Sequence, residues 1–157
     1  MVELNINIEQ GEEKKTVPKS NSGCNIFSKS FMDKPGVKSL ISGVSTVLQS
    51  QMVEDCKLGK KLNPTSENYF FSEEKYIKEK PDQFDDARLT LLRTTPSVEN
   101  IYEFIKALFD CAQFSPECCV VALVYINRII AFSVDMPLHP TNWRPLILCS
   151  LLVAQKV

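Results

Sequence analysis

The sequence predicts an all-α protein, a helical bundle whose packed core lies in the C-terminal part of the chain. Three segments support this prediction. Residues 97–112 carry apolar side chains on one helical face, whereas residues 116–134 and 146–154 are apolar on nearly every side. The chain has 157 residues, which is enough for one domain with its own core.

Charged residues are concentrated toward the N-terminus. Residues 97–157 contain only nine Asp, Glu, Lys or Arg side chains, and the formal net charge of the whole chain is -1. A nearly neutral chain exerts no broad attraction on polyanions, so we expect no nucleic-acid partner. Residues 1–36 are polar and show no sustained period, which predicts a largely disordered N-terminal tail.

Residues 37–96 are predicted to form an extension that is only partly helical. Residues 37–53 repeat apolar side chains at helical spacing, but Gly43 and several hydroxyl side chains weaken this helix. It therefore needs a partner surface. A second, short helix is expected over residues 72–80. Before it, Tyr69-Phe70-Phe71 is either a docking motif or a cover for the bundle.

Residues 97–157 are predicted to contain three helices. The first, over residues 97–112, is amphipathic, with apolar side chains three and four positions apart. They are Ile101, Phe104, Ile105, Leu108, Phe109 and Ala112. The second helix starts at Ser115-Pro116, where serine suits the N-cap and proline the first helical position. It is apolar until Asn127-Arg128, so most of it should be buried.

The third helix is predicted to begin after Thr141-Asn142, which suit a helix cap. Residues 146–154 have no polar face, so we expect this helix to sit centrally with others around it. Two helices that need burial on all sides require further helices to cover them. The helix at 37–53 is a candidate for one of these.

The six cysteines contain no C-x-x-C spacing, and His139 is the only histidine. A structural zinc site needs four ligands, usually in closely spaced pairs, so neither a metal nor another cofactor is expected. The cysteines are interpreted as free thiols that act as small buried side chains in a reducing compartment. No catalytic constellation stands out, so the protein is predicted not to be an enzyme.

Membrane attachment is not indicated either. The first ten residues lack the basic start and apolar run of a signal peptide, and Val2 excludes N-myristoylation, which needs glycine there. The apolar stretches are too short for a transmembrane segment. We expect a soluble intracellular protein, cytoplasmic or nuclear or both.

Four segments in the C-terminal part resemble consecutive pieces of a cyclin box. They are residues 101–109 (IYEFIKALF), 123–130 (LVYINRII), 140–148 (PTNWRPLIL) and 151–157 (LLVAQKV). Their order and spacing are most similar to those of cyclin Y and cyclin Y-like proteins. The resemblance covers residues 97–157 nearly continuously, whereas residues 37–53 resemble only loosely the helix that precedes the box in that family.

This resemblance implies a regulatory subunit that binds and activates a cyclin-dependent protein kinase, a cell-cycle class of protein. In the family the box has five helices, the third is central, and the third and fifth contact a helix in the small lobe of the kinase. The implied kinase is of the PCTAIRE/PFTAIRE kind, and Lys156 matches a kinase-contacting lysine. The implied structural core is Phe104, Leu108, Tyr125, Arg128, Trp143, Leu148 and Leu151.

The chain departs from the family pattern at two places. Family members continue past Val157 with Trp-Asp-Asp and two more helices, so the box is predicted to be truncated after its third helix. Asn127 replaces an acidic residue, so Asp110 or Asp135 is expected to pair with a buried Arg128. The truncation leaves an alternative function open, namely a non-activating helical scaffold or competitor of protein–protein interactions.

Two further residues have more than one interpretation. Trp143 is either a recognition aromatic or, as is more usual for a lone tryptophan at a helix start, a packing residue. Thr95-Pro96, which follows Arg93, is either a proline-directed phosphorylation site or a helix start with Thr95 as its cap.

Overall fold

The computed structural model describes residues 35–65, 67–80, 86–133 and 135–156. All secondary structure in these residues is helical, which confirms the all-α prediction, while residues 1–34 of the predicted disordered tail lie outside them. The elements are α1 (Pro35–Lys57), the 3₁₀ helix η2 (Glu67–Phe71), α2 (Glu73–Glu79), α3 (Asp86–Arg93), α4 (Val98–Ala112), α5 (Pro116–Phe132) and α6 (Trp143–Lys156).

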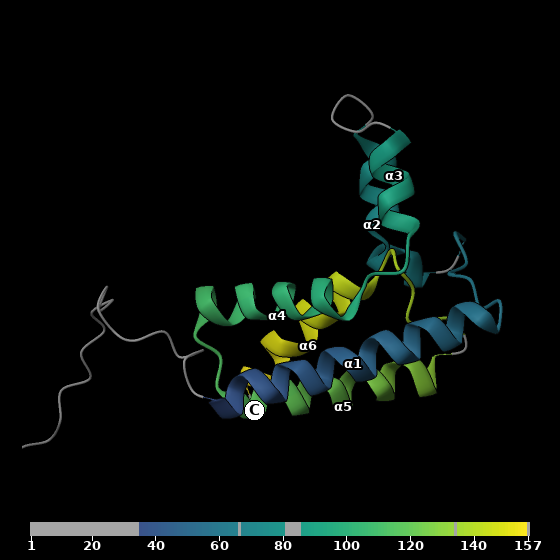
Figure 1. Ribbon diagram of the computed structural model, residues 1–157. Coiled ribbons are helices and arrows are strands. Elements are labelled where there is room, and N and C mark those ends of the chain that lie inside the picture. The colour runs from purple at the N-terminus through teal and green to yellow at the C-terminus, as the bar shows by residue number, and fades with distance from the viewer. Residues whose placement is uncertain (1–34, 66, 81–85, 134, 157) are drawn as a thin grey trace, which may run out of the picture.

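The core lies between the four longer helices, α1, α4, α5 and α6. Helix α1 packs on α4 and α5, and α5 packs along α6; Figure 1 shows these four helices gathered in one bundle. The buried stripe of α1 consists of Val37, Ile41, Val44, Leu48 and Met52, which belong to the same hydrophobic cluster as the residues of α4, α5 and α6. Helix α1 thus covers part of the C-terminal helices, as its apolar period suggests.

Helix α4 begins and ends at well-defined caps. The Ser97 hydroxyl accepts a hydrogen bond from the Asn100 N–H, which satisfies one of the free amides of the first turn. Gln113 ends the helix in the left-handed conformation, with φ of 51°. Of the six apolar residues expected on the core face of α4, Ile101, Ile105 and Phe109 are buried and Phe104 and Leu108 are half-buried. Ala112, in the last turn, is exposed.

Helix α5 starts at Pro116, as predicted, but Ser115 does not cap it through its side chain. The Ser115 hydroxyl lies 3.3 Å from the Cys118 sulfur instead. Most of α5 was expected to be buried, yet Val120, Val124 and Phe132 are exposed. Helices α1 and α6 cover only part of its circumference.

The short helices α2 and α3 project from one end of the bundle (Figure 1). The Glu73 N–H donates to the Thr141 carbonyl oxygen over 2.8 Å, which ties the start of α2 to the segment before α6. Glu74 pairs with Lys78 and with Arg93, so the same carboxylate joins α2 to α3. Helix α3 buries none of its side chains and is therefore held mainly by α2 and its ion pair.

The buried carboxylate of Asp55 links the end of α1 to the loop before α6 by a hydrogen bond. Asp55 is 1% exposed, and its side chain accepts hydrogen bonds from the Leu138 N–H at 3.0 Å and the Lys60 ammonium at 2.9 Å. Gln51 donates a third bond over 3.1 Å. A buried carboxylate is tolerated only when it is paired and hydrogen-bonded, and these three donors meet that requirement.

Candidate functional site

The outer face of α6 is apolar and exposed. Four side chains share this face, namely Leu148, Cys149, Leu152 and Val153. The last three follow Leu148 by one, four and five positions, which places all four on one side of a helix. Leu152 is 48% exposed and Val153 is 52% exposed. The expectation that α6 is surrounded is therefore wrong for this side, because its neighbours α5 and α4 pack against the opposite one.

Lys156 lies eight residues after Leu148 and so continues the same face of α6. It is exposed and occupies the last turn of the helix, where a cation interacts favourably with the helix dipole. The α6 outer face, defined here as Leu148, Cys149, Leu152, Val153 and Lys156, thus offers an apolar strip that ends in a positive charge. Such a surface suits a partner with apolar side chains and a nearby carboxylate or carbonyl oxygen.

Of the residues expected in the core, Trp143 and Leu151 are buried. Phe104, Leu108 and Tyr125 are partly buried and pack against the core cluster. The Trp143 ring meets the Phe104 ring edge-on, with centroids 5.2 Å apart, so Trp143 acts as a packing residue between α4 and α6.

Leu148 and Arg128 do not lie in the core. Leu148 belongs to the α6 outer face and is 37% exposed. Arg128 is exposed on α5, so the expectation that it is buried was wrong, and it needs no buried carboxylate. A solvated guanidinium avoids the desolvation cost that motivated the expected pair.

A polar cleft opens where the segment between α3 and α4 meets the start of α6. Its volume is about 490 Å³, and its lining includes Glu73, Arg88, Thr95, Asn100, Trp143 and Arg144. The Arg144 guanidinium lies 4.3 Å from the Trp143 ring centre, and its Nη1 donates to the Glu73 carboxylate over 3.3 Å. Burial raises the pKa of Glu73, and the nearby Arg144 opposes that effect.

Sequence reasoning did not predict this cleft. Glu73 and Arg144 are 71 residues apart, and nothing in either local sequence indicates their pairing. The one local signal was the Thr95-Pro96 motif, which lies in the wall of the cleft. Its interpretation as a helix cap was wrong, because Ser97 provides the cap of α4.

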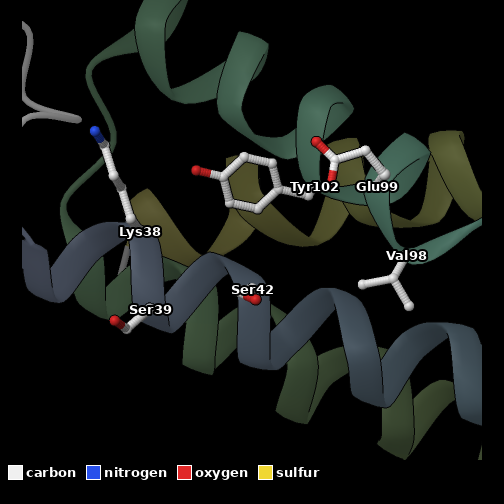
Figure 2. A pocket seen from close by; sticks show the side chains of 6 residues that line it. All are labelled: Lys38, Ser39, Ser42, Val98, Glu99 and Tyr102. Carbon is white, nitrogen blue, oxygen red and sulfur yellow. The ribbon is translucent and has the colours of Figure 1, made fainter.

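A shallow groove lies between α1 and α4 on another part of the surface. Figure 2 shows Tyr102 between Lys38 and Glu99, with its hydroxyl directed toward the Lys38 side. The groove has a volume of about 380 Å³ and is open to solvent. The groove is lined by one positive side chain, Lys38, and one negative side chain, Glu99. Its charges therefore favour neither an anionic nor a cationic ligand.

The described cysteines differ in burial, and Cys56 is half-buried. Cys118 and Cys119 are buried, as expected for small apolar side chains, whereas Cys111 and Cys149 are exposed. Burial raises the pKa of Cys119 to about 12, and the adjacent Cys118 adds to this effect. Cys24 lies outside the described residues. Among the residues that the structure does describe, no cluster of His, Cys, Asp and Glu could hold a metal ion.

His139 occupies the loop before α6. Its Nδ1 lies 2.9 Å from the Thr141 hydroxyl, and burial lowers the pKa of the imidazole. The imidazole is half-buried within the loop and serves the local hydrogen bonding of the segment that leads into α6.

None of the helices in the described part of the chain has the length and apolar character needed to cross a membrane.

No protein-family model matches the sequence. A search of the solved structures also found no match to this chain.

Proposed function

We propose that this protein is a cyclin-like regulatory subunit that binds a cyclin-dependent protein kinase of the PCTAIRE/PFTAIRE kind inside the cell. The observation that carries the proposal is the α6 outer face, an exposed apolar strip that ends at Lys156. Exposed apolar surface of this kind is typical of protein–protein contact sites. The residues that resemble a cyclin box include this same helix.

In the proposed complex the protein does no chemistry itself. Leu148, Leu152 and Val153 bury against an apolar surface of the kinase, and the Lys156 ammonium donates to an acceptor at its edge. Activation follows if this contact is stronger with the active kinase conformation than with the inactive one. The opposite side of α6, which includes Leu146 and Leu151, is buried in the core and holds the outer face in place.

Charge reversal at Lys156 tests the proposed contact. The variant Lys156→Glu should weaken binding to a purified PCTAIRE- or PFTAIRE-type kinase by about tenfold or more, because a rim cation at an interface is replaced by an anion. Lys57→Glu is the matched control, since Lys57 is also an exposed lysine in the last turn of a helix, α1. It should bind as the unmodified chain does.

The measurement is a binding titration by calorimetry or surface plasmon resonance, together with kinase activity at saturating protein. Equal affinity of the unmodified chain and the Lys156→Glu variant would remove Lys156 from the contact. Absence of any binding to kinases of this kind would reject the proposed function itself. Circular dichroism checks that both variants remain helical.

A second candidate function is a non-activating scaffold or competitor that binds through the same kind of helical surface. It is favoured by the extent of exposed apolar side chains on α5, where Val124 is 49% exposed and Phe132 is 80% exposed. The kinase titration distinguishes the two functions. Binding that leaves activity unchanged supports the scaffold or competitor, whereas binding with stimulation supports the regulatory subunit.

A further inference from the structure

The polar cleft has a hydroxyl-rich wall. Residues 94–97 connect α3 to α4 without helical structure, and three of them carry hydroxyl groups. The Thr94 hydroxyl donates to the Thr90 carbonyl oxygen over 2.9 Å, and the Ser97 hydroxyl caps α4. Within the residues that the structure describes, the Thr95 side chain makes no hydrogen bond. It is half-buried and is followed directly by Pro96.

Two arginines also line the cleft. They are Arg88 of α3 and Arg144 of α6, and Glu73 is the one carboxylate among the lining residues of the cleft. Arg144 reaches Glu73 only through Nη1, at 3.3 and 3.5 Å, which leaves its Nε and Nη2 for another acceptor. A phosphate carries more charge than a carboxylate and presents three acceptor oxygens, so it is the stronger partner for arginine.

We propose that Thr95 is a phosphorylation site and that Arg144 and Arg88 bind the phosphate in the cleft. The modifying enzyme is a protein kinase that requires proline after the acceptor and uses ATP. The Thr95 oxygen forms a bond to the γ-phosphorus, the bond between that phosphorus and the bridging oxygen breaks, and ADP leaves. The hydroxyl proton passes to a base of the modifying kinase.

The modifying kinase can reach Thr95 by local opening of the structure. Pro96 is buried, so the segment must leave the surface in order to enter a kinase active site. Helix α3, which precedes it, buries no side chain, and such segments open at low free-energy cost. After phosphorylation, the phosphate replaces Glu73 as the main partner of Arg144 and holds the α3–α4 segment against α6. This inference does not depend on the proposed function.

The modification is tested first. The full chain is incubated with ATP and an active mitogen-activated protein kinase, and phosphorylated residues are identified by mass spectrometry. We expect phosphate at Thr95, its loss in Pro96→Ala and Thr95→Val, and its retention in Thr94→Val. The first variant removes the recognition residue but leaves the acceptor hydroxyl. Failure to find phosphate at Thr95 in the unmodified chain overturns the site.

The binding of the phosphate is tested by phosphorus NMR of the phosphorylated chain. A phosphothreonine has a second pKa of about 6, and arginines nearby should lower it by roughly one unit or more. The shift should shrink in Arg144→Gln and in Arg88→Gln but persist in Arg128→Gln, which alters an exposed arginine on α5. The same pKa in the folded chain and in the chain unfolded by urea overturns the cationic cleft as its binding site.

Discussion

At the scale of single residues, the neighbouring thiols of Cys118 and Cys119 differ from the other cysteines in their surroundings. Both lie on the buried face of α5, whereas Cys111 and Cys149 point to solvent from α4 and α6. Sequence reasoning predicted free thiols but treated all of them as buried. It failed for Cys149 because a residue within an apolar run is exposed or buried according to which side of the helix its neighbours cover.

This difference predicts selective alkylation. At pH 8 the thiolate fraction of Cys119 is about 10⁻⁴, because burial raises its pKa to about 12 and only the thiolate reacts. We expect iodoacetamide to label Cys111 and Cys149 in the folded chain and to leave Cys119 unlabelled, as measured by peptide mass spectrometry. In urea Cys119 should react as the others do. Rapid labelling of Cys119 under native conditions would show that α5 is not packed as described.

At the scale of the helices, local sequence signals predicted the four helices of the bundle and α2, whereas α3 and the 3₁₀ helix η2 were not predicted. The period of α4, the serine and proline that start α5, and the apolar stripe of α1 each predicted a helix within a few residues of the observed bounds. The exposed faces of α5 and α6 could not be predicted in this way. A helix that is apolar all round has no period that identifies its buried side.

The packing of α1 can be tested by a pair of substitutions on its two sides. Ile41→Ala should lower the free energy of unfolding by about 2–5 kcal/mol, because Ile41 is fully buried among α4 and α5 residues. Val47→Ala, on the exposed side of the same helix, should change it by no more than about 0.5 kcal/mol. Urea unfolding followed by circular dichroism measures both. Similar losses for the two variants would mean that α1 does not cover the bundle.

At the scale of the whole molecule, the arrangement depends on contacts between distant parts of the chain. The Glu73–Arg144 pair and the hydrogen bond between Asp55 and Leu138 join segments more than 70 residues apart, and neither contact has a local signature. Sequence reasoning therefore predicted the bundle but missed the polar cleft. Conversely, the resemblance to a cyclin box predicts that α6 and Lys156 contact a kinase, and this role stays a prediction.

The exposed apolar surface predicts how the isolated protein behaves. The double variant Leu148→Gln/Leu152→Gln should bind less of a fluorescent dye that recognises apolar surface, with little change in thermal stability, since both side chains are exposed. Leu146→Gln is the control on the buried side of α6 and should destabilise the fold by about 1–3 kcal/mol. Unchanged dye binding in the double variant would place the accessible apolar surface elsewhere.

The bond between Asp55 and Leu138 has a consequence during synthesis of the protein on the ribosome. Helix α1 is made early, but its buried carboxylate finds the Leu138 amide only after 83 further residues have been added. At about 5–20 residues per second this interval lasts roughly 4–17 seconds. For most of it the apolar stripe of α1 lacks its partners on α5, so we expect the nascent chain to expose a surface that chaperones bind until α5 and the loop after it have emerged.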